Sequence, residues 1–185
     1  MEIEQYNSLP IDSIIARNYG DDIHYTDSFR MEFCNSEGLS VDYLATLFFT
    51  WSPGWVKILL SMRDAIAGLM GLKTGSLPEP SAVDKTIRYN LGEKLVYFSL
   101  IDRSDSEIVM AEDDKHLYFR TSVFIQKNPN SDVDSVFVAT MVHFHNIWGR
   151  IYFAPVKPFH QLIIRRMLVH FGKIIRTFKA DEKFK

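Results

Sequence analysis

The chain has 185 residues, which is the length of one domain. Apolar residues make up 46% of it and aromatic residues 14%, enough to bury a core, so a disordered tail is excluded. The net charge of −2 argues against a generic nucleic-acid binder. No uncharged apolar run reaches the roughly 18 residues that a membrane-spanning helix needs. The lone Cys34 excludes an internal disulfide and, with no signal-peptide pattern at the N-terminus, indicates a cytoplasmic protein.

The charge is unevenly distributed along the chain. Residues 150–185 hold nine Lys or Arg and two acidic residues, a net charge of +7, which leaves −9 for residues 1–149. One interpretation is a basic C-terminal helix that lies on a more acidic body. The other is a basic amphipathic helix that binds an anionic membrane or nucleic acid. The apolar stripe between the basic positions favours the first, so we expect neither nucleic acid nor an integral membrane segment.

The first half of the chain predicts a strand followed by two short helices. Over residues 22–33, apolar and polar positions alternate with period two, which is typical of a half-buried strand. One phase of this alternation consists of Ile23, Tyr25, Asp27, Phe29, Met31 and Phe33. Ser40 is a candidate N-cap for a first helix, and Ser52 with Pro53 marks the start of a second. The Gly- and Pro-rich residues 73–92 then predict a long surface loop.

The second half predicts a β-meander and one long helix. Short polar turns separate four strand candidates, which are residues 94–102, 107–112, 115–126 and 133–145. Consecutive strands joined by short turns pair antiparallel. After Pro158, apolar residues recur at spacings of three and four as far as Phe178. This helix must bury its stripe, and the meander is the large surface that can cover it.

This order of elements resembles the helix-grip fold of the START and Bet v 1-like (SRPBCC) superfamily. The resemblance implies an α+β fold in which a curved antiparallel sheet wraps a long C-terminal helix, with two short helices after the first strand. It also implies a ligand cavity between the sheet and that helix. We expect a single domain over residues 1–185, with 1–20 as a lead-in and 177–185 as a loose end.

Three segments narrow the resemblance. SPGWVKILLSMRDAIAGLMGLKTG (52–75), EDDKHLYFR (112–120) and HFHNIWGRIYFAPVKPFHQLIIRRML (143–168) are similar to an uncharacterised bacterial family, the domain-of-unknown-function family number twenty-eight sixty-seven. In some members of that family a similar domain follows a nucleotide-binding dehydrogenase-like domain, but this chain contains no Gly-rich fingerprint. The resemblance therefore implies a fold and leaves the activity open.

The histidines are the first candidates for chemistry. His143 and His145 are two residues apart on a predicted strand, so their rings point to the same side. If the loop 127–131 pairs odd positions with odd ones, both histidines face the interior. A slip of one residue turns Val142 and Phe144 inward instead, and the sequence leaves this register open. The candidate cavity-lining residues are His116, Tyr118, Arg120, Met141, His143, His145, Trp148 and His160.

Metal and nucleophile motifs are weak. The HxH of His143 and His145, with His116, His160 or an acid of residues 112–114, contains the residue types of a zinc site. However, the chain has no HExxH, and a single cysteine cannot supply a thiolate set. We therefore expect no metal and no cofactor. No GxSxG surrounds a serine, so no catalytic residue is assigned.

Three functions follow as hypotheses. The leading one is a non-catalytic protein that binds a small hydrophobic or aromatic ligand between the sheet and the C-terminal helix. The first alternative is a cyclase- or dehydratase-like enzyme that uses cavity histidines as acid and base. The second alternative is a homodimer or a partner of a dehydrogenase-like protein, because the strand 133–145 is apolar on both faces before its histidines.

Overall fold

A computed structural model describes residues 2–20, 22–35, 38–56, 85–96 and 98–182, with side chains up to Arg176. The elements in chain order are β1 (Ile3–Tyr6), α1 (Ile14–Asn18), β2 (Tyr25–Cys34), α2 (Val41–Phe49), β3 (Lys94–Leu95), β4 (Phe98–Arg103), β5 (Glu107–Asp113), β6 (Leu117–Gln126), β7 (Val133–Phe144) and α4 (Ile147–Glu182).

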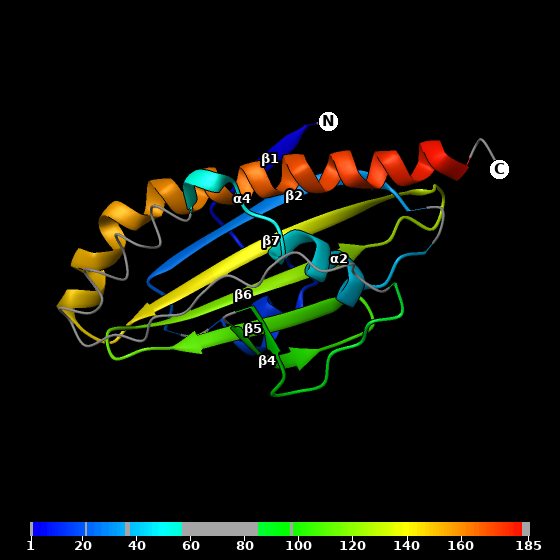
Figure 1. Cartoon of the computed structure of the whole chain (residues 1–185). Coiled ribbons are helices and arrows are strands. Elements are labelled where there is room, and N and C mark those ends of the chain that lie inside the picture. The colour runs from blue at the N-terminus through cyan, green and yellow to red at the C-terminus, as the bar shows by residue number, and fades with distance from the viewer. Residues whose placement is uncertain (1, 21, 36–37, 57–84, 97, 183–185) are drawn as a thin grey trace.

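The strands form one open antiparallel sheet in the order β1-β2-β7-β6-β5-β4-β3. The long helix α4 lies along one face of this sheet beside α2, and it contacts β2 and β7 (Figure 1). We call this side the α4 face. The short helix α1 packs on the opposite side, which we call the α1 face. The structure is therefore an α+β fold with a seven-stranded sheet and a long C-terminal helix.

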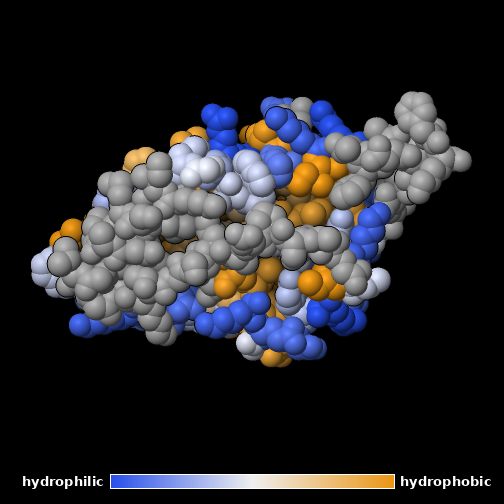
Figure 2. Space-filling view, in the orientation of Figure 1, coloured by the Kyte–Doolittle hydropathy of each residue, from blue (hydrophilic) through white to orange (hydrophobic). Residues whose placement is uncertain are grey.

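The main core lies between the α4 face of the sheet and the two helices. Strand residues Phe29, Met110 and Val138 pack there with Leu168 and Phe171 of α4, and all of these side chains are buried. In Figure 2, apolar side chains gather in the middle of this side, and hydrophilic ones lie along its rims. A smaller cluster around Ile15 of α1 covers part of the α1 face. Alternation along the strands thus supplies one large and one small apolar layer.

Most predicted elements are confirmed. Ser40 caps α2 by accepting a hydrogen bond from the Tyr43 amide, and the strand candidates of the meander appear as β4 to β7. The candidate strand 94–102 was wrong in one respect, because the chain reverses at Val96, whose φ of 61° ends β3. Residues 54–56 are helical, as the Ser52–Pro53 signal predicts. The rest of that predicted helix and the loop residues 73–84 lie outside the described residues.

The last helix begins at Ile147, twelve residues before the predicted start. It runs through Pro155 and Pro158, which lie in its first turns on the exposed side. Each proline removes one backbone hydrogen bond, and α4 bends in this region (Figure 1). Gly149 allows the first turn to sit on the sheet, because a Cβ there would lie 2.1 Å from the His116 carbonyl oxygen. The helix forms despite the backbone hydrogen bonds lost at the two prolines, because the first turn of α4 packs closely against the rest of the protein.

The N-terminal residues 2–20 contact the sheet, which the sequence did not predict. Strand β1 pairs with the edge of β2, and α1 packs on β5. Glu107, at the start of β5, is buried and accepts hydrogen bonds from the Ile14 and Ile15 amides at the beginning of α1. This carboxylate therefore holds α1 against the sheet.

Glu107 makes stability depend on pH. Burial raises the pKa of its carboxyl above the ordinary 4.5, although the amide hydrogen bonds of α1 oppose that shift. The folded state therefore holds the proton more tightly than the unfolded state. The contribution of Glu107 is complete below pH 4.5 and is lost as the pH rises through the folded pKa. We expect the wild type to gain stability relative to Glu107→Gln as urea denaturation is moved from pH 7.5 towards 4.5. An unchanged difference would contradict this.

A second buried network joins α2 to β4. Asp42 of α2 is 3% exposed, and its two carboxylate oxygens accept from Arg103 of β4 at 3.0 and 2.9 Å. Asp42 also accepts from the Tyr89 amide, and Arg103 donates to the Tyr89 carbonyl oxygen. The loop before β3 is thereby fixed to both elements.

Candidate functional site

The register of β6 and β7 decides which way the predicted histidines point. Tyr118 lies opposite His143 and Arg120 opposite Met141, so odd positions of one strand pair with even positions of the other. Val142 and Phe144 therefore face α4, and Met141, His143 and His145 lie on the α1 side. The alternative that placed both histidines under the C-terminal helix is corrected by this pairing.

The other predicted site residues are dispersed. His116 is buried in the β5–β6 turn, with Nδ1 3.1 Å from Asn146 Oδ1. The Arg120 guanidinium stacks on the Tyr118 ring on the α1 face, 4.0 Å from its centroid. Trp148 is exposed in the first turn of α4. Of the predicted set, His160 points from α4 towards the sheet. Ligand binding by these residues remains a prediction, and their positions define more than one surface.

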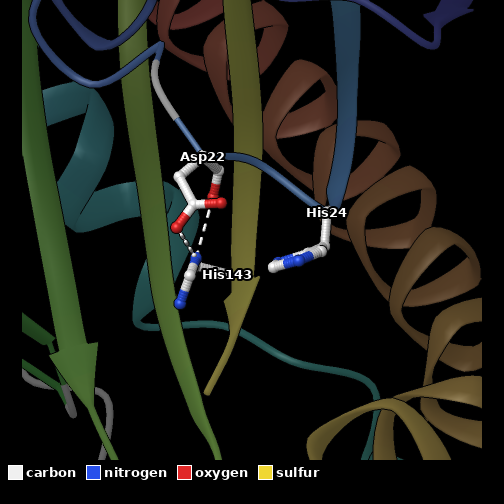
Figure 3. A group of neighbouring side chains, drawn as sticks. All are labelled: Asp22, His24 and His143. Atoms are coloured by element: carbon white, nitrogen blue, oxygen red, sulfur yellow. Dashed lines mark hydrogen bonds and ion pairs between the residues drawn. The ribbon is translucent and has the colours of Figure 1, made fainter. Parts of the chain in front are cut away.

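One cluster forms at the end of the sheet where β2 begins and β7 ends. His143 Nδ1 lies 2.8 Å from the Asp22 carbonyl oxygen and 3.2 Å from its carboxylate Oδ2. The ring of His24 points towards His143, with 4.9 Å between the ring centroids (Figure 3). Next to them, His145 Nε2 lies 2.7 Å from Asp113 Oδ1. Three histidines and two carboxylates thus share one end of the sheet.

Backbone geometry fixes this cluster. The His24 amide donates to the Val142 carbonyl oxygen, which extends the β2–β7 ladder and sets His24 beside His143. Asp22 has a φ of 55°, a left-handed conformation that Asp tolerates better than most residues. This turn directs both the carbonyl and the carboxylate of Asp22 at His143. Since a carbonyl oxygen only accepts, Nδ1 of His143 is the donor in this contact.

A second, buried cluster lies between the sheet and α4. The Tyr25 hydroxyl donates to Asp27 Oδ2 at 2.5 Å and accepts from Gln161 Nε2 at 3.1 Å. Burial raises the pKa of the Tyr25 phenol, and the hydrogen bond to Asp27 raises it further, so the phenol keeps its proton. His160 Nε2 lies 3.5 Å from Asp27 Oδ1, which places an imidazole beside a fully buried carboxylate.

Two atoms of this cluster have no hydrogen-bond partner in the described part of the chain, namely Asp27 Oδ1 and His160 Nε2. A buried polar atom without a partner costs about 1–3 kcal/mol, so its presence calls for an explanation. No sequence motif pointed to Tyr25, Asp27 or Gln161 as site residues. The available signal was Asp27 itself, an acid in the apolar phase of the strand 22–33.

An open pocket of about 330 Å³ adjoins this cluster at the end of the sheet. Its walls come from the start of β2, the end of β7 and the first turns of α4. The lining residues are His24, Tyr25, Phe144, Arg150, Phe153, Ala154 and Lys157. The Tyr25 and Phe153 rings are 4.9 Å apart, and Lys157 Nζ lies 4.9 Å from the Tyr25 ring centroid. Neither Arg150 nor Lys157 forms an ion pair with a described carboxylate.

The fold and these sites define an α+β protein with a long helix on an antiparallel sheet and an aromatic, cationic pocket at one end. None of the described helices is both long and apolar enough to cross a bilayer. The chain belongs to the family described as "Protein of unknown function (DUF2867)", whose model matches residues 20–167. Neither the curated proteins nor the solved structures contain a match to the chain.

Proposed function

We propose that the protein binds a small aromatic anion in the pocket between the end of the sheet and the first turns of α4. The observation that carries the proposal is the combination of aromatic walls with two cations that have no carboxylate partner among the described residues. Tyr25, Phe144 and Phe153 offer ring surfaces, and Arg150 and Lys157 offer charge. A volume of about 330 Å³ suits a ligand of one or two rings.

The architecture supports this proposal. The order of the strands and the helix on one face are compatible with the helix-grip fold of START and Bet v 1-like proteins, in which ligands occupy the space beneath the last helix. The pocket lies at the open end between α4 and the sheet, and this position is consistent with a ligand site beside the last helix. We propose the superfamily membership together with the ligand-binding role.

Titration with 1-naphthoate, followed by calorimetry, tests the proposal. We expect saturable binding by the wild type and about tenfold weaker binding, or about 1.4 kcal/mol, by the double variant Arg150→Gln/Lys157→Gln. The matched control Arg166→Gln/Arg176→Gln removes the same charge from exposed positions of α4 and should retain the wild-type affinity. Uncharged 1-naphthamide should bind more weakly than naphthoate. Equal losses in both double variants, or no saturable binding, would refute the proposal.

A second candidate function is proton-transfer catalysis, which is favoured by Asp27 Oδ1 and His160 Nε2, two atoms that lie 3.5 Å apart and have no hydrogen bond among the described residues. An imidazole that is 13% exposed and lies beside a buried carboxylate is suited to remove a proton from a bound ligand and return it. Phenylpyruvate, an aromatic carboxylate whose C3 protons are acidified by the adjacent ketone, serves as the probe. We expect the wild type in D2O to accelerate deuterium exchange at C3 and His160→Gln to abolish that acceleration. His170→Gln is the control and should stay active. Exchange at the protein-free rate would exclude this function for phenylpyruvate-like ligands.

A further inference from the structure

We propose that Asp22, His24 and His143 form a binding site for a divalent transition-metal ion, with zinc as the best-matched metal. Each of the three residues offers one ligand atom, and these atoms lie within 4.8 Å of one another. Imidazole nitrogen and carboxylate oxygen are both ordinary zinc ligands. The site is separate from the Asp27 cluster and does not require the pocket to bind a ligand.

The closest pair of donors already has the spacing of two ligands on one ion. His143 Nδ1 and Asp22 Oδ2 are 3.2 Å apart. Two ligands at about 2.0–2.1 Å from a tetrahedral zinc ion are about 3.3–3.4 Å apart. An ion can therefore replace the proton that His143 Nδ1 shares with Asp22, and that proton moves to Nε2 of the same ring. Figure 3 shows the backbone carbonyl oxygen and the carboxylate Oδ2 of Asp22 both directed at His143.

His24 is the third proposed zinc ligand, and it must give up a hydrogen bond to bind the ion. Its Nδ1 accepts a hydrogen bond from the Phe144 amide at 3.0 Å, so one ring nitrogen is already occupied. Coordination through Nδ1 replaces that hydrogen bond, and coordination through Nε2 moves the Nε2 proton to Nδ1, which also ends the hydrogen bond from the Phe144 amide. We therefore expect Asp22 and His143 to contribute more to affinity than His24.

The exposure of the cluster defines what kind of site it is. The Asp22 side chain is 78% exposed and the His143 side chain 23%. Three protein ligands leave at least one coordination position of a zinc ion for water. This is the arrangement of zinc sites with an open position, whereas structural zinc sites have four protein ligands. His145 is the neighbouring histidine, but its Nε2 is engaged by Asp113, which places it outside the proposed set.

Competition between metal-stripped protein and a chromophoric zinc indicator tests the site. We expect one zinc ion per wild-type chain, and at least about tenfold lower affinity in His143→Gln and in Asp22→Asn. His145→Gln is the matched control, since it alters the same HxH motif without touching the three ligands, and should stay within about twofold of the wild type. Circular dichroism should show that all variants are folded.

Two outcomes would overturn the proposal. One is a wild-type protein that does not compete with the indicator for zinc. The other is a loss in His145→Gln as large as that in His143→Gln, with Asp22→Asn unchanged, because that pattern identifies a surface HxH chelate. Neither Asp22 nor His143 lines the aromatic pocket. Naphthoate binding should therefore persist in both variants, and failure of the metal site is distinguishable from failure of the proposed ligand pocket.

Discussion

Replacing Arg103 with methionine is expected to lower the free energy of unfolding by about 3–5 kcal/mol, as is typical when one member of a buried ion pair is removed. The substitution leaves the Asp42 carboxylate, which is 3% exposed, without the guanidinium that holds both of its oxygens. It also removes the donor to the Tyr89 carbonyl oxygen. Urea denaturation at pH 7, followed by far-ultraviolet circular dichroism, measures the loss.

Arg30→Met provides the matched control for Arg103. Arg30 pairs with Glu4 and Glu32 on the surface, where all three side chains are partly exposed. Exposed pairs contribute little because water and salt screen them. The loss for Arg30→Met should therefore be clearly smaller than the loss for Arg103→Met. Similar losses in the free energy of unfolding for the two variants would contradict the prediction that the Asp42–Arg103 pair matters because it is buried.

Converting the buried polar cluster into an apolar one is expected to stabilise the protein. The triple variant Tyr25→Phe/Asp27→Leu/His160→Leu should gain about 1–4 kcal/mol in the free energy of unfolding, the range found when buried ion pairs are replaced by hydrophobic residues of similar size. The gain arises because Asp27 Oδ1 and His160 Nε2 no longer lie buried without hydrogen bonds. Thermal and urea denaturation measure the gain.

The single variant Asp27→Leu is the control for the triple one. It removes the acceptor of the Tyr25 hydroxyl and leaves His160 without its carboxylate, so it should lose stability rather than gain it. A triple variant less stable than the wild type would show that the cluster serves the fold. A stabilised variant that no longer exchanges deuterium into phenylpyruvate would show that these residues trade stability for activity.

The local elements could be predicted because their signals are local. The Ser40 hydroxyl caps α2 within four residues, and the period-two alternation of residues 22–33 reports which side of one strand is buried. The start of α4 could not be predicted in this way. Pro155 and Pro158 are local stop signals, and contacts with distant residues, such as Phe153 on Tyr25, outweigh them.

The sites depend on pairings between segments far apart in the chain. Whether His143 faces α4 depends on the parity of the β6–β7 connection, and one residue more in that loop would turn the ring to the other side. The contact between His143 and Asp22 joins residues 121 positions apart, and the contact between Asp27 and His160 joins β2 to α4. The types and spacing of residues along the chain do not indicate which distant residues come into contact.

Gly149 allows α4 to begin in close contact with the β5–β6 turn. Because this residue has no Cβ, the first turn of α4 packs directly against the carbonyl group of His116. This contact sets the distance between the start of α4 and the β5–β6 turn. Arg150, Phe153 and Lys157 all follow within the next two turns, so their separation from Tyr25 and Phe144 is set by that contact. Any larger side chain at this position would clash with that carbonyl group, so the first turn of α4 would have to move outward, and the proposed pocket would widen without a change in any residue that lines it.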